Sequence, residues 1–299
     1  MKIPKMSIGS WAFSFGPFES DPWDFPRVLR YAADAGFDGI EINGFKPHPD
    51  PDFYNTDDKC KRLMAEIKDY GLGVSGYAPS FAETPPSEVE EKVYLDSAAK
   101  SVSFCERCDI RALRVDSASP PDELAVAEYE ARFSRLAKTW NKAAEICEKS
   151  GIALVWEFEP GFWLNKPSEV LRLYEAVGHA NFKVLFDTSH AYMGAVVGAR
   201  QTGVPELLKG GVPEYAEMLG DAIGHLHLID SDGSLHDNET STHAPFGTGY
   251  VDFAASLKPI VPIISGFSWW TADFCFWPGT EEAARKAPGQ MRRIAESVL

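Results

Sequence analysis

The segment VLFDTSHAY, at positions 184–192, ends an apolar run with a carboxylate and an imidazole three residues apart. The apolar residues predict a buried strand, and burying Asp187 or His190 is costly unless each is paired or bound to a ligand. The strand therefore either reaches solvent at this point or ends at the rim of a binding site. The choice depends on which polar residues other strand ends bring to the same place.

The same pattern recurs along the chain, because several apolar runs end in residues that can bind a metal or move a proton. These residues are Glu41, Asn43, Arg114, Asp116, Glu157, Glu159, His225, His227, Asp230 and Asp273. Two carboxylates, an imidazole and a further acid on the last four runs provide oxygen and nitrogen ligands that suit Mn²⁺, Mg²⁺ or a similar cation. If these acids lie close together in the fold, they also require a cation, since each carboxylate would otherwise raise the pKa of the others.

Short apolar runs alternate with longer segments of helical periodicity, which is typical of parallel βαβ units. The predicted strands occupy residues 5–10, 37–43, 72–77, 110–116, 152–158, 182–187, 223–230 and 261–274. The predicted helices include residues 25–36, 56–71, 128–151 and 280–299. Gly36, Gly71 and Gly151 end three of these helices, because glycine tolerates the positive φ of a helix C-terminus.

Eight strands, each followed by a helix, predict a (β/α)₈ TIM barrel that forms a single domain over residues 1–299. An open doubly wound sheet is the alternative, but no GxGxxG motif follows the first strand. The Pro- and Gly-rich segments 44–55, 78–88 and 194–213 follow strands two, three and six, where barrel enzymes carry substrate loops. Since the carboxyl ends of all strands converge on one mouth of a barrel, the polar residues above become neighbours.

The composition disfavours several classes of partner. Lys and Arg number 29 against 44 Asp and Glu, for a net charge of −15 that would repel nucleic acid in the absence of a basic patch. The five cysteines are an odd number in a chain large enough to bury a core, so we expect free thiols in a reducing compartment. No apolar segment has the length of a signal-peptide core or a membrane span. We therefore expect a cytoplasmic protein that binds neither nucleic acid nor a membrane.

Several segments together resemble the successive motifs of a known family. They are GFDGIEI (36–42), WEFEPGF (156–162) followed by NKPSEVLRLY (165–174), LFDTSHAY (185–192), GHLHLID (224–230) and HAPFGTGYVDF (243–253). Through these segments the chain resembles the xylose-isomerase-like TIM barrels, which form the sugar phosphate isomerase/epimerase superfamily. The resemblance implies a contact between His190 and a substrate oxygen. It also implies a metal held by Glu157, Asp187, His227 and Asp273.

The chain departs from the ketose 3-epimerases of that superfamily at two positions. Those enzymes use a glutamate on strand eight as ligand and base, whereas Asp273 is shorter by one methylene group. They also carry an arginine six residues beyond the strand-seven histidine, where this chain has Gly233. The catalytic candidates are therefore Glu157, Asp273, Glu159 and His190, with His243 as a further alternative base.

Other side chains near the mouth are expected to bind the substrate or to support the site. The expected substrate-binding residues are Trp11, Glu41, Arg114, His190 and His243. Aromatic residues near strand ends and loops predict an aromatic wall to the pocket. They are Trp11, Phe13, Phe15, Phe162, Trp163, Trp269, Trp270 and Trp277. In strand seven we expect His227 to face the barrel interior and His225 to pack against the helix layer. We expect His48, in the loop after strand two, to be solvated.

These observations predict a divalent-metal enzyme that abstracts a proton next to the carbonyl of an unphosphorylated ketose or keto-sugar. A cation, with Mn²⁺ favoured over Mg²⁺ and Co²⁺, would stabilise the enediolate, and a carboxylate or histidine would move the proton. Returning the proton to the opposite face or to the other carbon makes the enzyme an epimerase or an isomerase.

The same residues leave rival functions open. Elimination from the same intermediate would make the chain a lyase or dehydratase of an inosose or a 3-keto-glycoside. This includes the C-glycoside deglycosidase type, whose barrel subunit pairs with a small β-rich partner. A non-catalytic sugar-binding or partner subunit would bind no metal, and the chain could also form a homo-oligomer. An abasic-site endonuclease is disfavoured, because Ser241 replaces the aspartate of its zinc cluster.

Overall fold

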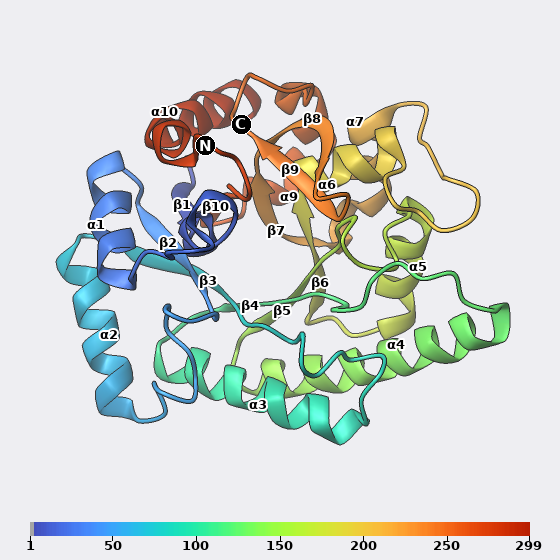
Figure 1. The fold of residues 1–299 in the computed structure, drawn as a ribbon, viewed down its shortest axis with the longest axis horizontal. Helices are drawn as coiled ribbons and strands as arrows, with labels where there is room; N and C mark the ends of the chain where they lie inside the picture. The colour runs from blue at the N-terminus through green and yellow to red at the C-terminus, as the bar shows by residue number, and fades with distance from the viewer. Residues whose placement is uncertain (1–2) are drawn as a thin grey trace.

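The computed structural model describes residues 3–299 and contains a closed barrel of eight parallel strands. The strands lie at the centre of the molecule with helices around them (Figure 1). They are β1 (Lys5–Gly9), β2 (Gly39–Asn43), β3 (Gly73–Ala78), β4 (Ala112–Val115), β5 (Ala153–Glu157), β6 (Phe182–Asp187), β7 (Ile223–Leu228) and β10 (Trp269–Ala272). Their order around the barrel is β1, β10, β7, β6, β5, β4, β3, β2. The predicted TIM barrel is confirmed, and each strand overlaps a predicted one.

Helices connect the strands and cover the barrel. They are α1 (Phe25–Ala35), α2 (Asp57–Asp69), α3 (Glu91–Arg107), α4 (Val126–Lys149), α5 (Pro167–Val177), α6 (Thr188–Tyr192), α7 (Gly211–Leu219), α8 (Phe253–Leu257), α9 (Val261–Ile264) and α10 (Thr280–Val298). The side chain of Asp24 caps α1 by accepting the N–H of Arg27 at 2.8 Å. Gly36, after α1, has a φ of 85° and ends the helix as predicted.

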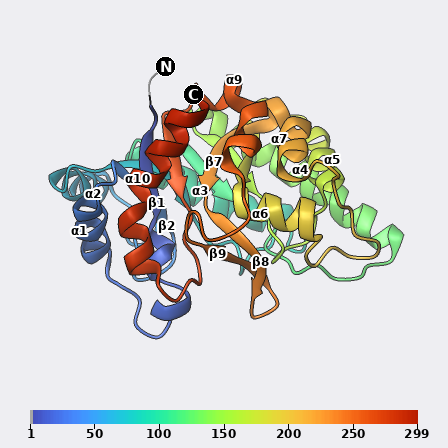
Figure 2. The same ribbon diagram turned by 90° about the horizontal axis from the view of Figure 1, so that it is seen from above.

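Two elements in the C-terminal half of the chain differ from the prediction. The predicted strand 261–274 is shorter, because Pro262 lies in the first turn of α9 and only Trp269–Ala272 joins the barrel. The residues after β7 form an additional antiparallel hairpin of β8 (Asp230–His236) and β9 (Thr240–Ala244). Figure 2 shows this hairpin on the side of the barrel opposite the chain termini.

The hairpin is made possible by its turn. Asp237 and Asn238 both have a positive φ, of 50° and 61°, and the N–H of Glu239 donates to the carbonyl of His236 at 2.8 Å. This is the type I′ geometry that matches the twist of paired strands, and Asp and Asn tolerate it better than most residues. The Asp-Asn pair was therefore a local signal for the hairpin.

The cysteines agree with the predicted absence of disulfides. All five thiols are free; Cys60, Cys105, Cys108 and Cys147 are buried, and Cys275 is half-buried. Among residues 3–299, no helix combines the length and the apolar character that crossing a bilayer requires.

The prediction that His48 is solvated is wrong. Its ring is 2 % exposed, because the loop after β2 folds back against the short helical turn that follows β1. The Nε2–H of His48 donates to the carbonyl of Trp23 at 3.0 Å, and its Nδ1 accepts the hydroxyl of Ser10 at 3.0 Å. The Ser10 oxygen in turn accepts the N–H of Asn43 at 2.8 Å. Burial lowers the pKa of His48 to about 4.

Replacing His48 by Gln is expected to reduce the acid sensitivity of the fold. Between about pH 6.5 and pH 4 the unfolded chain binds a proton at His48 that the folded chain does not, so stability falls as pH falls through this range. The full shift corresponds to about 3 kcal/mol. Urea midpoints at pH 7.5 and pH 4.5 test this: the wild-type protein should lose more stability on acidification than His48→Gln. Equal losses would contradict the assignment.

Candidate active site

A cavity of about 360 Å³ lies over the carboxyl ends of the barrel strands, where TIM barrels place their active sites. Predicted site residues that line it are Trp11, Arg114, Glu157, Glu159, His190, His243 and Asp273. Asp187 and His227 are not among the lining residues and contact the cavity residues from below. The mouth is therefore a single concave site, as the convergence of strand ends requires.

Four potential metal ligands meet at the floor of this cavity. They are Glu157, Asp187, His227 and Asp273, and one ligand atom of each lies within 4.8 Å of the others. All four are at most 2 % exposed. They come from the carboxyl ends of β5, β6, β7 and β10, which are consecutive neighbours in the barrel. The parallel register places Asp187 directly beside His227, so the barrel itself brings the group together.

Asp187 carries the observation that fits a cation. Its Oδ1 caps α6 by accepting the N–H of His190 at 2.8 Å, whereas its buried Oδ2 has no hydrogen-bond partner among residues 3–299. A buried carboxylate oxygen without a partner is rare and demands an explanation. Burial, with Asp273 and Glu157 close by, raises the pKa of Asp187 to about 8 although His243 and His227 oppose the shift. A divalent cation would compensate for the charge that these acids share.

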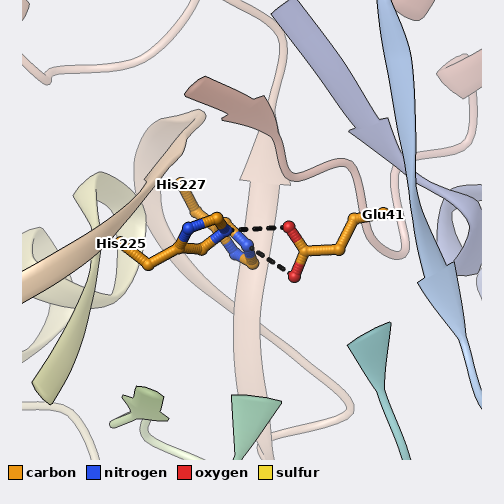
Figure 3. A group of neighbouring side chains, drawn as sticks. All are labelled: Glu41, His225 and His227. Atoms are coloured by element: carbon orange, nitrogen blue, oxygen red, sulfur yellow. Dashed lines mark hydrogen bonds and ion pairs between the residues drawn. The ribbon is translucent and has the colours of Figure 1, made fainter. Parts of the chain in front are cut away.

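His225 and His227 both face the barrel interior, so the prediction that His225 packs against the helix layer is wrong. Residues two apart on a strand point to the same side, and both rings reach the carboxylate of Glu41 (Figure 3). The Nε2 of His225 lies 2.9 Å from Oε2 of Glu41, and the Nε2 of His227 lies 3.3 Å from Oε1. Although burial opposes charge on Glu41, the two histidines hold its pKa well below the usual value.

Glu41, a predicted substrate-binding residue, is not among the residues that line the cavity and lies beneath its floor. An Nε2–H directed at Glu41 fixes the tautomer of His227 and leaves Nδ1 toward the cluster, 2.9 Å from Oε1 of Glu157 and 3.3 Å from Oδ2 of Asp273. Metal-binding histidines usually have such a carboxylate behind them. The hydroxyl of Thr271 also donates to Glu41, at 3.0 Å.

Positive groups surround Glu157 and Asp273 and keep them ionised. The guanidinium of Arg114 lies 2.6 Å from Oε2 of Glu157, and with His227 it outweighs burial and lowers the pKa of Glu157. Asp273 accepts the indole N–H of Trp11 at 2.5 Å and lies 3.5 Å from Nδ1 of His243. Burial opposes ionisation of Asp273, but His243 and His227 hold its pKa well below the usual value.

The other predicted catalytic residues lie around the same cavity and are held by the hairpin. Burial and the nearby Glu157 raise the pKa of Glu159 to about 7, and the hydroxyl of Thr240 donates to its Oε2. Burial lowers the pKa of His190 to about 3, and its Nδ1 lies 2.9 Å from the Ser241 hydroxyl. His190 is therefore a neutral imidazole, which can exchange hydrogen bonds with a substrate.

His243 differs from His190 because it lies beside an acid. Burial lowers the pKa of its imidazole, but Asp273 and the nearby Asp187 outweigh this and raise it to about 9. The cavity thus contains one neutral and one protonated imidazole, whose ring centroids are 5.0 Å apart.

Several site residues were missed because their positions depend on loops. Arg200 lines the cavity and donates to the backbone carbonyl of Glu239 at 3.0 Å, and Phe45 and Phe276 also line it. Asp230, a predicted strand-end residue, is structural instead. Its carboxylate accepts backbone N–H groups from residues 231, 247, 249 and 251 at 2.9–3.0 Å and holds the GTGYV turn.

The model of the xylose isomerase-like TIM barrel family matches residues 29–289. The chain belongs to this family. Fructoselysine 3-epimerase of Shigella flexneri is 24 % identical over 252 residues, which cover 79 % of this chain and 80 % of the relative. Inosose dehydratase of Geobacillus kaustophilus is 24 % identical over 195 residues, 62 % of this chain and 59 % of that enzyme. A solved structure of L-ribulose 3-epimerase superposes with a TM-score of 0.72 at 20 % identity, covering 99 % of this chain and 95 % of the other.

Within the xylose isomerase-like family, the two departures noted from the sequence have visible consequences. The shorter Asp273 still reaches the cluster, with Oδ2 3.3 Å from Nδ1 of His227. Gly233 lies in β8 of the hairpin with a φ of 78°. The arginines that line this cavity come instead from β4, as Arg114, and from the segment after α6, as Arg200.

Replacing Glu41 by Gln is expected to weaken Mn²⁺ binding by roughly 10–100-fold, the usual effect of losing the carboxylate behind a histidine ligand. Gln retains the size of Glu but turns an amide N–H toward one of the two imidazole donors. Isothermal titration with Mn²⁺ measures the change. Glu296→Gln, on the exposed face of α10, is the matched control. Equal affinities for the two variants would refute the supporting role of Glu41.

Replacing Asp187 by Asn is expected to abolish retention of Mn²⁺ while leaving the barrel folded. Asn keeps an oxygen that can cap α6 but removes the charge of the unpartnered oxygen. Equilibrium dialysis followed by elemental analysis reports the bound metal. Asp252→Asn changes the same kind of cap on α8, at an exposed residue outside the cluster, where Asp252 accepts the N–H of Ala255 at 3.0 Å. Full metal retention by Asp187→Asn would remove it from the ligand set.

Proposed function

We propose that this protein is a divalent-metal-dependent epimerase or isomerase of an unphosphorylated ketose or keto-sugar. The observation that carries the proposal is the four-residue cluster of Glu157, Asp187, His227 and Asp273 at the floor of an open cavity. Fructoselysine 3-epimerase among the relatives supports the same reaction class. The reaction would begin with removal of a proton next to a carbonyl.

The cluster would hold the metal through three carboxylates and one imidazole. This set of hard oxygen ligands with one borderline nitrogen suits Mn²⁺ better than a thiolate-preferring ion, and Mg²⁺ or Co²⁺ fits the same donors. When bound, such a cation polarises a carbonyl and a neighbouring hydroxyl and makes the adjacent C–H more acidic. Glu41 and Arg114 would keep His227 and Glu157 in position.

Proton transfer falls to residues that line the cavity and are free to change protonation. Glu159 is a suitable base, because it is buried, hydrogen-bonded to Thr240 and adjacent on the same strand face to Glu157. His190, in α6, and His243, in β9, would hold substrate hydroxyls, with His243 as an alternative acid. Trp11 would form part of the floor beneath the sugar.

The charges of the cavity support a substrate without a phosphate group. Arg114 is already paired with Glu157 at 2.6 Å and Asp116 at 3.7 Å. The Nη1 of Arg200 donates to the backbone carbonyls of Pro160 and Glu239. A phosphate needs donors that are not already committed to other acceptors. Among residues 3–299, the lining of this cavity contains no lysine.

A lyase or dehydratase is the second candidate, and one feature favours it. Asp273 replaces the longer glutamate of the ketose 3-epimerases, so the two-glutamate arrangement for moving a proton between faces is not reproduced. Inosose dehydratase is also among the relatives. If the carbon next to the deprotonated one carries a leaving group, the same proton abstraction ends in elimination.

Incubation in D₂O separates these outcomes. The Mn²⁺-loaded protein is expected to exchange the α-hydrogen of D-fructose or of a 3-keto-glucoside at least about 100-fold faster than the EDTA-treated protein, the usual gain from a positioned acid or base. Proton NMR measures the exchange. Exchange without loss of water or aglycone supports epimerisation or isomerisation, and an unsaturated product that absorbs in the ultraviolet supports elimination. Tight Mn²⁺ binding without exchange of any of these sugars would contradict both and favour a non-catalytic sugar-binding subunit.

A further inference from the structure

We propose that the outer part of the cavity binds an aromatic substituent, so that the substrate is a keto-sugar carrying an aryl aglycone. The inference rests on the proposed function for the polar floor of the cavity. It adds a second subsite, built from side chains that take no part in holding the metal or moving a proton.

One wall of this subsite is formed by Phe15, Phe45 and Phe276. They follow β1, β2 and β10, which are adjacent strands in the barrel. The ring centroid of Phe15 lies 5.5 Å from that of Phe45 and 6.0 Å from that of Phe276. These are the separations of interacting aromatic rings, so the three side chains form one continuous wall.

The Phe276 end of the wall is held from behind by the hairpin. The ring of His236 stacks on Phe276, with centroids 4.2 Å apart and an angle of 10° between the planes. Phe276 itself has a positive φ of 64°, an uncommon conformation for a bulky residue that the surroundings must stabilise. The structure therefore holds this ring at the cavity rather than leaving it on a mobile loop.

The facing wall is apolar as well. It is formed by Ala118 and Pro120 after β4 and by Phe162 after β5. An incoming planar group would thus meet apolar atoms on two sides, while the carboxylates and imidazoles lie at the floor. Cavities that bind organic ligands commonly combine apolar walls with a few polar groups at fixed positions.

These rings differ from the other aromatic residues of the molecule in their exposure. Phe13, Phe81, Phe104, Phe182 and Phe274 are at most 1 % exposed and belong to the core. Phe15, Phe45, Phe162 and Phe276 are only partly buried although they lie in a cavity. Apolar surface left open in a concave site marks a place where a ligand is bound.

The charges make an aromatic group a better occupant than an anionic or a purely polyhydroxylated one. Among the described lining residues, Arg114 pairs with Glu157 and the Nη1 of Arg200 donates to backbone carbonyls, so neither arginine is set up to grip a carboxylate or phosphate substituent with both of its terminal nitrogens. Additional hydroxyl groups would lose water against the three phenylalanines without gaining hydrogen bonds. A planar apolar ring would gain from burial and from contact with the aromatic faces.

A matched pair of ligands tests the subsite apart from the reaction. Methyl and phenyl 3-keto-β-D-glucopyranoside differ only in the aglycone, and EDTA-treated protein can bind them without turning them over. Isothermal titration is expected to give a dissociation constant at least about tenfold lower for the phenyl compound, as burial of an aromatic ring implies. A ratio near one would overturn the inference, whether or not the metal-loaded protein exchanges the α-hydrogen. Conversely, tight binding of the phenyl compound without any exchange would count against the proposed function alone.

Substitutions in the aromatic wall test whether its phenylalanines cause the preference for the phenyl over the methyl compound. Phe45→Ala and Phe276→Ala are each expected to reduce the phenyl-to-methyl ratio by about threefold or more and to leave affinity for the methyl compound unchanged. Phe276→Leu keeps an apolar side chain at that position and should give an intermediate ratio. Phe53→Ala is the control, because Phe53 lies outside the cavity with 59 % of its surface exposed. A preference that survives both alanine variants would overturn the inference.

Discussion

Charge compensation at the mouth of the barrel is the constraint on which the rest of the site depends. Glu157, Asp187 and Asp273 are buried within a few ångströms of one another, and like charges repel more strongly in a low-dielectric interior than in water. Arg114 and the imidazole of His243 supply part of the positive charge. The unpartnered oxygen of Asp187 shows where the protein groups alone are insufficient. A bound cation would complete the balance.

The same requirement extends one layer below the floor. Barrel interiors are filled by layers of side chains from alternate strands, usually apolar ones. Here Glu41 instead joins His225, His227 and Thr271, and the Thr271 hydroxyl lies 2.9 Å from that of Ser7. Every polar group of this layer has a partner on another strand, so its hydrogen bonds form only when the strands are in register. Closing the barrel and orienting His227, the candidate metal ligand, are therefore one event.

Much of this could be predicted from the sequence because it follows from local patterns. Apolar runs that end in Asp or Glu, and helices that end in Gly36 or Gly151, define a parallel barrel whose strand ends converge. His225 was misplaced although the two-residue spacing from His227 assigns both to one face. His48 and Phe276 could not be placed, since their burial depends on how loops from distant strands pack. The hairpin was only partly predictable. Its Asp237-Asn238 turn is a local signal, but the rest of the segment resembles an ordinary connection between a strand and a helix.

The hairpin has a consequence for how such a barrel can diversify. Thr240, Ser241 and His243 reach the cavity from β9, and their placement is set by a tight turn and a two-stranded ladder rather than by the barrel strands. A module that folds by its own short-range rules can be exchanged or reshaped without disturbing the eight-stranded scaffold. Natural selection, or an engineer, could thus alter what enters the cavity while the four-residue cluster beneath it stays in place.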